Sequence, residues 1–254
     1  VGFYPAVHAG YNARDMMYDY EKLGIAFKKF HKDFGTDILA SCFLMGPGKV
    51  FEILDYKLYQ WPGNGTPDDT SYQCVEKEYM QAVDYDMLID DPSGYWMRQY
   101  LPRTFGAFAS WQALPPWTDL VELPFVGATM IPYGLPQVQE SLKKLMEAGQ
   151  AALEWAGAFQ SIDGEVQATE GLPPMIGGFA KAPYDTLGDT LRGTRPIMLD
   201  MFRRPEKLLQ ALERLVPMNI EMGVRAATIN RNPFVFIPLH KGADGFLSNK
   251  DFAK

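Results

Sequence analysis

The fold is decided by two apolar stretches, Leu172-Pro173-Pro174-Met175-Ile176-Gly177-Gly178-Phe179 and Phe234-Val235-Phe236-Ile237-Pro238-Leu239. Each has the length of a buried strand and is followed by polar residues. Between them, an apolar pattern of helical period begins at Pro205 and includes Leu208, Leu209, Leu212, Leu215 and Val216. A strand, a helix and a second strand in this order predict two parallel strands with a helical crossover.

The rest of the chain continues this alternation. Helices are predicted over residues 18–34, around 50–54, over 72–82 and from 136 to 156, and strands over 38–44 and 85–89. Pro217 is expected to interrupt the helix that begins at Pro205, with a further helical stretch to Ala227. Residues 95–135 are rich in aromatic residues and Pro, lack a clear period, and are interpreted as a long excursion over the rim of a barrel. A doubly wound sheet is the competing architecture, but the sequence lacks a Gly-rich phosphate loop.

Size and composition narrow the class of protein. The chain has 254 residues, of which 47% are hydrophobic, which suits one large α/β barrel or two small domains. A net charge of −7 without a Lys/Arg cluster argues against nucleic acid and anionic membranes as partners. Two cysteines, Cys42 and Cys74, argue against a disulfide framework. With no signal peptide and no apolar run of membrane-spanning length, we expect a cytoplasmic protein.

Parallel α/β barrels place their active-site groups at the carboxyl ends of the strands. That rule selects Asp91 and Ser93 after the 85–89 strand, Tyr184 and Asp185 after the 172–179 strand, and His240 after the 234–239 strand. The imidazole of His240 can bind zinc or move protons near neutral pH. A histidine hydrogen-bonded to a loop at a strand end fits its position equally well.

The other candidates also have a structural interpretation. Asp91 precedes a proline and can simply start a turn, and Asp185 can cap a helix. Arg192 can bind a carboxylate or phosphate with its planar guanidinium, or it can form a structural ion pair. The residues predicted to bind substrate are Asp91, Ser93, Arg192 and Lys241.

Three stretches of the C-terminal half share the order and approximate spacing of one known family. They are residues 172–187, residues 203–209, which read Arg-Arg-Pro-Glu-Lys-Leu-Leu, and residues 236–252. They resemble, in turn, the Pro-Leu-Ile-Gly-Phe strand and Gly-x-Pro-Trp-Thr-Leu loop, the Pro-Glu helix, and the Asp-Ser-Trp-x-Gly strand end of the uroporphyrinogen decarboxylase superfamily. The N-terminal half is similar to methyltransferase-like members at residues 61–65, 76–80, 84–86 and 91–93.

The resemblance implies a (β/α)8 TIM barrel that forms a single domain over residues 1–254, with strands missing at both ends. True decarboxylases carry Asp at the position of His240. Corrinoid-dependent methyltransferases carry a zinc-binding His there, followed two residues later by Cys. That later position is Gly242 in this chain, and we expect a remaining zinc ligand beyond Lys254. His240 therefore favours the methyltransferase branch.

By this resemblance, the chain is an enzyme that transfers a methyl group to or from a corrinoid held on a separate partner protein. Zinc, with His240 as a ligand, would activate an acceptor thiol or polarise a methyl donor. His240, Tyr184 and Asp185 would form the catalytic group, and Asp91 would help to hold the small-molecule donor or acceptor. Two alternatives remain open: a metal-free uroporphyrinogen III decarboxylase of tetrapyrrole biosynthesis, and a noncatalytic barrel that binds a tetrapyrrole or a partner.

Overall fold

A computed structural model describes residues 2–241 and 245–253. The chain, predicted from its sequence to be a single domain, groups its contacts into two compact units. The first unit comprises residues 1–75 and 101–175, and the second comprises residues 76–100 and 176–254. No helix among the described residues combines the length and apolar character that crossing a membrane requires.

The helices near the start of the first unit follow the sequence pattern closely. Helix α3 (Tyr20–Phe34) begins after Asp19, whose side chain accepts a hydrogen bond from the backbone of Lys22 at 3.0 Å. It ends at Gly35, which has a φ of +54°. Its apolar face packs with α1 (Tyr4–Ala9) and α2 (Ala13–Tyr18), which confirms the helix predicted over residues 18–34.

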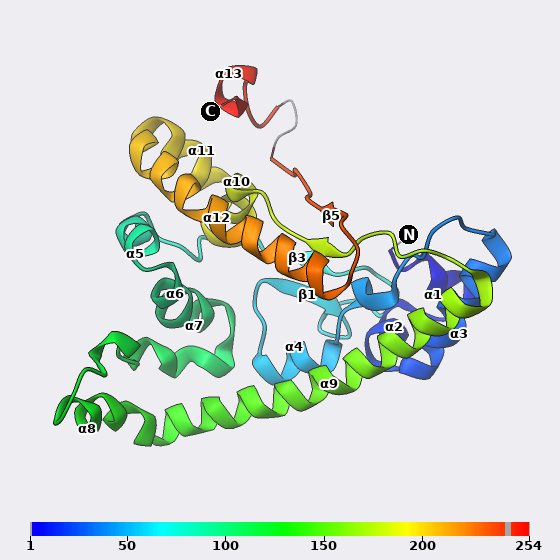
Figure 1. Cartoon of the computed structure of the whole chain (residues 1–254), viewed down its shortest axis with the longest axis horizontal. Coiled ribbons are helices and arrows are strands. Elements are labelled where there is room, and N and C mark those ends of the chain that lie inside the picture. Colours follow the sequence, from blue (N-terminus) through cyan, green and yellow to red (C-terminus); the bar gives the residue numbers. More distant parts are fainter. Residues whose placement is uncertain (1, 242–244, 254) are drawn as a thin grey trace. The chain divides into compact units, whose positions relative to one another are not determined.

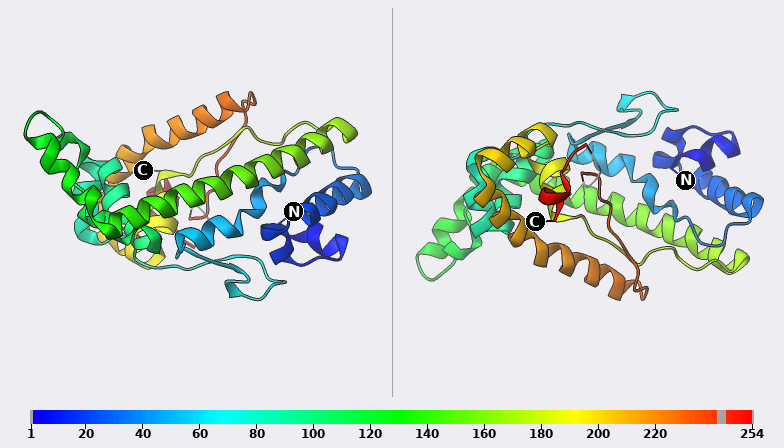
Figure 2. Two further views of the ribbon diagram at one scale, coloured as in Figure 1. Left: turned by 90° about the horizontal axis from the view of Figure 1, so that it is seen from below. Right: turned by 90° about the horizontal axis from the view of Figure 1, so that it is seen from above.

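The longest element of the first unit is α9 (Pro136–Glu170), which begins at the predicted proline and continues past the predicted end. Helices α3 and α4 (Gly48–Leu54) pack along it, as both views in Figure 2 show. The helix predicted around residues 50–54 is therefore confirmed. Close packing on one side of α9 explains why a helix with three internal glycines remains regular.

A small sheet in the first unit corrects one predicted helix. Strand β1 (Tyr59–Pro62) pairs in parallel with β2 (Gly65–Thr66) and antiparallel with β3 (Gln73–Cys74). The helix predicted over 72–82 is wrong, because residues 73–75 pair with the β1 segment instead. The backbone N–H of Val75 donates to the carbonyl of Leu58 at 2.7 Å.

The strand predicted over residues 38–44 is reduced to a single parallel bridge between Leu39 and Pro174. Residues Cys42–Met45 form a 3-10 turn, η1. The Ser41 hydroxyl accepts from the backbone of Phe43 at 3.1 Å and donates to the carboxylate of Asp163, which fixes the turn at its start. These side-chain bonds compete with a strand ladder and end it after one residue pair.

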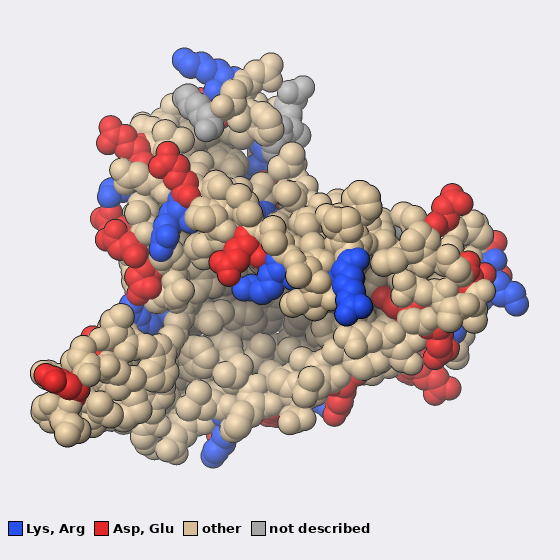
Figure 3. All heavy atoms as spheres, viewed as in Figure 1, with Lys and Arg blue, Asp and Glu red and all other residues tan. Residues whose placement is uncertain are grey.

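Residues 95–135 form short helical turns instead of one regular element: η3 (Trp96–Tyr100), α7 (Leu101–Thr104), η4 (Gly106–Ala113), η5 (Trp117–Asp119), α8 (Phe125–Met130) and η6 (Ile131–Gly134). The part around α8 exposes Val121, Leu123 and Ile131 to solvent. Figure 3 shows this end of the first unit, at lower left, as largely uncharged surface with acidic atoms at its tip.

In the second unit, the segment predicted as a strand over 85–89 is helix α5 (Tyr85–Asp90), so that prediction is wrong. It follows a short 3-10 turn, η2 (Ala82–Asp84), and precedes α6 (Pro92–Tyr95). The Asp84 carboxylate accepts from the backbone of Gln81 at 2.6 Å, which starts a helical turn. Tyr85 and Leu88 are both buried, and this spacing of three suits a helix face.

The predicted parallel pair is present in the second unit. Strands β4 (Gly178–Phe179) and β5 (Val235–Phe236) pair in parallel, with Gly178 opposite Val235. The connection between them contains α10 (Pro183–Asp185), the π-helical turn η7 (Thr186–Leu191), α11 (Thr194–Arg203) and α12 (Pro205–Ile229). The architecture is thus α/β, but the strands of the described residues form no closed barrel.

Helix α12 lies against β4 and β5 in Figure 1, and two glycines allow the close approach. A Cβ on Gly178 would lie 2.9 Å from the carbonyl oxygen of Gly223 on α12. The predicted interruption at Pro217 is wrong, since α12 continues through it. Buried residues on both sides of the proline, Leu215 before it and Gly223 after it, hold the helix together despite the missing N–H donor. The last described helix is α13 (Asn249–Phe252).

Candidate functional site

The carboxyl ends of β4 and β5 lie side by side because the two strands are parallel. The segment after β4 leads to Tyr184 and Asp185, and the segment after β5 leads to His240 and Lys241. The Asp185 carboxylate accepts from the backbone N–H of His240 at 3.0 Å and from that of Lys241 at 2.8 Å. The structure therefore brings four of the predicted site residues together.

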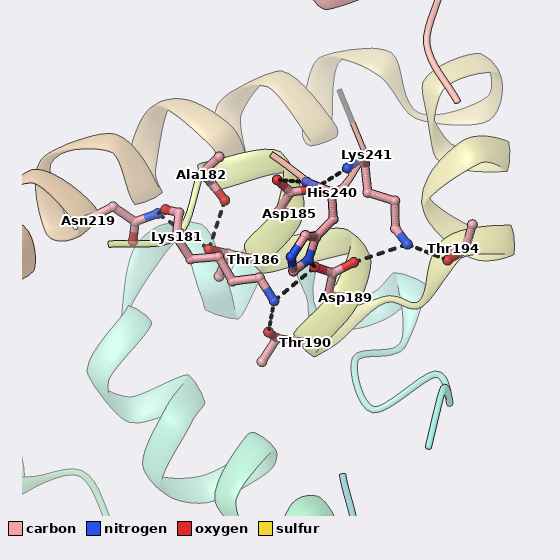
Figure 4. Close-up of polar contacts among 10 residues, drawn as sticks. All are labelled: Lys181, Ala182, Asp185, Thr186, Asp189, Thr190, Thr194, Asn219, His240 and Lys241. Atoms are coloured by element: carbon pink, nitrogen blue, oxygen red, sulfur yellow. Dashed lines mark hydrogen bonds and ion pairs between the residues drawn. The ribbon is translucent and has the colours of Figure 1, made fainter. Parts of the chain in front are cut away.

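A second carboxylate, Asp189 on η7, organises the side chains of this cluster (Figure 4). Its Oδ2 atom lies 2.8 Å from Nδ1 of His240 and 3.0 Å from Nζ of Lys181, and its Oδ1 atom lies 3.0 Å from Nζ of Lys241. Lys241 also donates to the Thr194 hydroxyl at 2.7 Å. One carboxylate thus faces three side chains that carry or accept a positive charge.

The cations around Asp189 determine its ionisation. Burial opposes the charged carboxylate, but the hydrogen bonds from His240, Lys181 and Lys241 outweigh it and hold the pKa of Asp189 below its ordinary value. Asp189 was not among the residues selected from the sequence. Its spacing of four from Asp185 was the available signal, because residues four apart lie on the same face of a helix.

The imidazole of His240 is held at one nitrogen and exposed to solvent. Its side chain has a relative exposure of 61%, whereas that of Asp189 has 15%. A carboxylate on Nδ1 fixes the orientation of the ring and leaves Nε2 as the atom for a proton, a metal or a partner group. Both interpretations made for His240 are thus compatible with its geometry, since the residue is anchored and its ring is also accessible.

Tyr184 and Asp185 line a pocket with a volume of about 180 Å³. Its apolar walls come from Leu208, Leu209 and Leu212 of α12, from Leu239 after β5, and from Leu247 and Phe252. The Tyr184 hydroxyl contacts the sulfur atoms of Met198 at 3.6 Å and Met201 at 3.3 Å. Burial, together with the negative charges of Asp185 and Asp251, raises the pKa of Tyr184 to about 12, so the phenol stays protonated near neutral pH.

Arg192 lies in the interior of the second unit, away from the pocket lining. Its Nε atom is 2.7 Å from Oδ2 of Asp200, its Nη1 donates to the carbonyl of Met80 at 2.6 Å, and it also pairs with Glu78. The Tyr85 hydroxyl donates to the same Asp200 carboxylate at 2.8 Å. Of the two interpretations given for Arg192, this geometry favours the structural ion pair.

Asp91 and Ser93 lie at the start of α6 and take no part in the cluster around Asp189. The Asp91 carboxylate accepts from the backbone of Gly94 at 2.9 Å and pairs with Arg98 at 3.1 Å. Ser93 is exposed on the same turn. Because the preceding segment is a helix rather than a strand, the strand-end rule that selected these two residues does not apply to them.

Comparison with protein-family models, curated proteins and solved structures finds no match to this chain. The geometry of the second unit is therefore the ground for a functional proposal.

The residues described here do not by themselves form the zinc site that the sequence resemblance implies. Within 2–241 and 245–253, no three His, Cys, Asp or Glu side chains are placed to hold a metal ion. His240 contributes a single accessible imidazole, and the nearby Asp189 is already paired with two lysines. Gly242, which occupies the position of the expected cysteine, lies outside the described residues.

Proposed function

We propose that this chain is a methyltransferase of the uroporphyrinogen decarboxylase superfamily, which binds its small-molecule substrate in the pocket beside Tyr184 and Asp185. The proposal rests on one observation above all. His240 follows a strand that pairs in parallel with β4, and its backbone is fixed by Asp185 from the segment after β4. Convergence of side chains at the ends of parallel strands is typical of barrel active sites.

The proposal extends to the fold and the partner. The β4–α12–β5 unit is taken as one repeat of the superfamily's TIM barrel, and a corrinoid-bearing protein is the proposed partner. Such a protein would dock over the exposed ring of His240, whose side chain is 61% exposed. Tyr184 and Asp185 would hold the donor or acceptor in the pocket.

In this proposal His240 is the one described residue assigned as a zinc ligand. Bound zinc would lower the pKa of a thiol or polarise a methyl donor. Because the described residues offer no complete ligand group, we assign to them only two tasks: Asp189 orients the His240 ring, and the pocket walls exclude water.

The charge of the pocket argues against the decarboxylase alternative. A porphyrinogen with many carboxylates requires cationic side chains to bind it. The described lining of the pocket contains Asp185 and Asp251 but no Lys or Arg. Negative charge at these positions would repel such a substrate.

Zinc content, measured by elemental analysis of the purified protein, tests the proposal. With the remaining ligands supplied from outside the described residues, we expect about one zinc per chain in the wild type and its loss in His240→Ala. His8→Ala is the matched control, because the Nε2 atom of His8 also pairs with a carboxylate, Asp33, at 2.8 Å. A wild-type protein without zinc, or equal loss of zinc in both variants, would overturn the zinc-dependent mechanism.

A further inference from the structure

The pocket beside Tyr184 combines apolar walls with negative charge. Three leucines within two turns of α12 form one wall, and Leu239 and Phe252 contribute to the others. Such walls favour alkyl or aromatic groups on a ligand, because the binding of these groups removes apolar surface from water.

Two carboxylates interrupt this apolar lining. Asp185 is 2% exposed, and the groups that donate to it are the neutral backbone N–H groups of His240 and Lys241. Asp251 also lines the pocket and accepts a hydrogen bond from the Ser248 hydroxyl at 2.6 Å. Both negative charges act on the Tyr184 hydroxyl, whose pKa they help to raise. The interior of the pocket therefore has a negative potential.

The N-terminus of helix α12 opposes this potential. Helix α12 begins at Pro205 in the pocket wall, and its N-terminus contributes about half of a positive charge. The full negative charge of the buried Asp185 carboxylate exceeds this contribution, and Glu206 in the first turn of α12 offsets it further.

We infer that the pocket binds a small organic cation with apolar substituents, of the alkylated ammonium class. This assignment rests on the proposed function in taking the pocket as the substrate site. The alkyl groups pack against the leucines, and the positive charge faces Asp185 and Asp251. The rings of Tyr184 and Phe252 provide aromatic surface of the kind that attracts quaternary ammonium groups.

Calorimetric titration with three compounds tests the assignment. They are butyltrimethylammonium, hexanoate, and a neutral analogue of the cation, 2,2-dimethylhexane carrying a hydroxyl group for solubility. We expect the cation to bind at least about tenfold more tightly than the neutral compound, and hexanoate not to bind. Asp251→Asn should weaken binding of the cation about tenfold. Glu213→Gln, on the exposed side of α12, changes the net charge equally and should leave binding unchanged.

Leu209→Trp provides a second variant that fills the pocket without changing charge, and it should abolish binding of the cation. Equal binding of the neutral isostere, or cation binding that survives both Asp251→Asn and Leu209→Trp, would overturn the inference. Zinc content separates this result from the proposed function. Cation binding without zinc would leave the pocket assignment standing and remove the methyltransferase mechanism, whereas zinc without cation binding would do the reverse.

Discussion

The Nδ1 atom of His240 lies 2.8 Å from the Oδ2 atom of Asp189, although the two residues are 51 positions apart in the chain. The same carboxylate pairs with Lys181 from the segment after β4 and with Lys241 from the segment after β5. One acidic side chain therefore joins the ends of both parallel strands, and several consequences can be measured.

Replacement of Asp189 by Asn should lower the free energy of unfolding by about 2–4 kcal/mol, because it leaves two mostly buried lysines without their counter-charge. Urea denaturation at pH 7 measures the loss. Asp33→Asn is the control, since Asp33 also pairs with a histidine and a lysine but on the exposed surface of the first unit. An equal loss of unfolding free energy in Asp33→Asn would show that burial does not strengthen the ion pairs of Asp189.

The contribution of Asp189 to stability should depend on pH in a defined direction. Its pKa in the folded protein lies below its ordinary value, so its contribution is fully present above the unfolded-state pKa of about 3.9. The contribution is lost as pH falls through the lower, folded-state pKa. The difference in unfolding free energy between wild type and Asp189→Asn should therefore shrink as pH falls below about 4. A difference that grows as pH falls below about 4 would contradict the lowered pKa of Asp189.

Arg192→Met should destabilise the protein by about 3–5 kcal/mol, because it leaves the buried Asp200 carboxylate without its main partner. Thermal or urea unfolding measures this effect. Arg225→Met removes an exposed pair with Glu221 and should have little effect. Adding Asp200→Leu to Arg192→Met should restore part of the stability, because it removes the unpaired carboxylate. If stability is not restored, the loss in Arg192→Met does not come from burying the Asp200 charge without a partner.

Two glycine substitutions should change stability in opposite directions. A Cβ on Gly177 would lie 2.0 Å from the carbonyl oxygen of Asn232, so Gly177→Ala should destabilise by about 1–3 kcal/mol. A Cβ on Gly149 of α9 would meet no atom within 4 Å, so Gly149→Ala should stabilise by about 0.5–1 kcal/mol. Urea denaturation of both variants at one pH provides the comparison, and a shift in the same direction for both would contradict this prediction.

The two cysteines should differ in reactivity. Burial, and then the negative charge of Asp163, raise the pKa of the Cys42 thiol, whereas Cys74 is exposed. At pH 8 an aromatic disulfide reagent should modify one thiol in the native protein and two in urea, as counted by absorbance. In Cys74→Ser the native count should fall to zero, and a remaining fast-reacting thiol would show that Cys42 is accessible.

The parallel pair and the convergence at its carboxyl ends could be predicted from the sequence. Apolar runs on either side of a long helical pattern leave few alternatives for residues 172–179 and 234–239, and parallel strands necessarily end at one edge. The same rule placed Tyr184, Asp185 and His240 together without any knowledge of their contacts.

The predictions that were wrong depended on short segments whose structure is set by distant partners. Residues 85–89 suit a buried strand or a short helix equally well by composition, and the contact of Tyr85 with Asp200 helps to hold the helix. Residues 38–44 do not form the predicted strand, because the Ser41 hydroxyl bonds to Asp163, which lies 122 positions later in the chain. Asp189 was missed for the same reason, since its role depends on lysines and a histidine from two other segments.

The double hydrogen bond that Asp185 accepts from the backbones of His240 and Lys241 has a kinetic consequence. Both N–H groups belong to a segment beyond the end of β5, where exchange with deuterated solvent is ordinarily fast. Here exchange at these two amides must wait until the carboxylate releases them. The rate of deuterium uptake at these amides therefore measures how often this segment detaches from α10. Asp185→Ala should increase that rate and leave exchange in α9 unchanged.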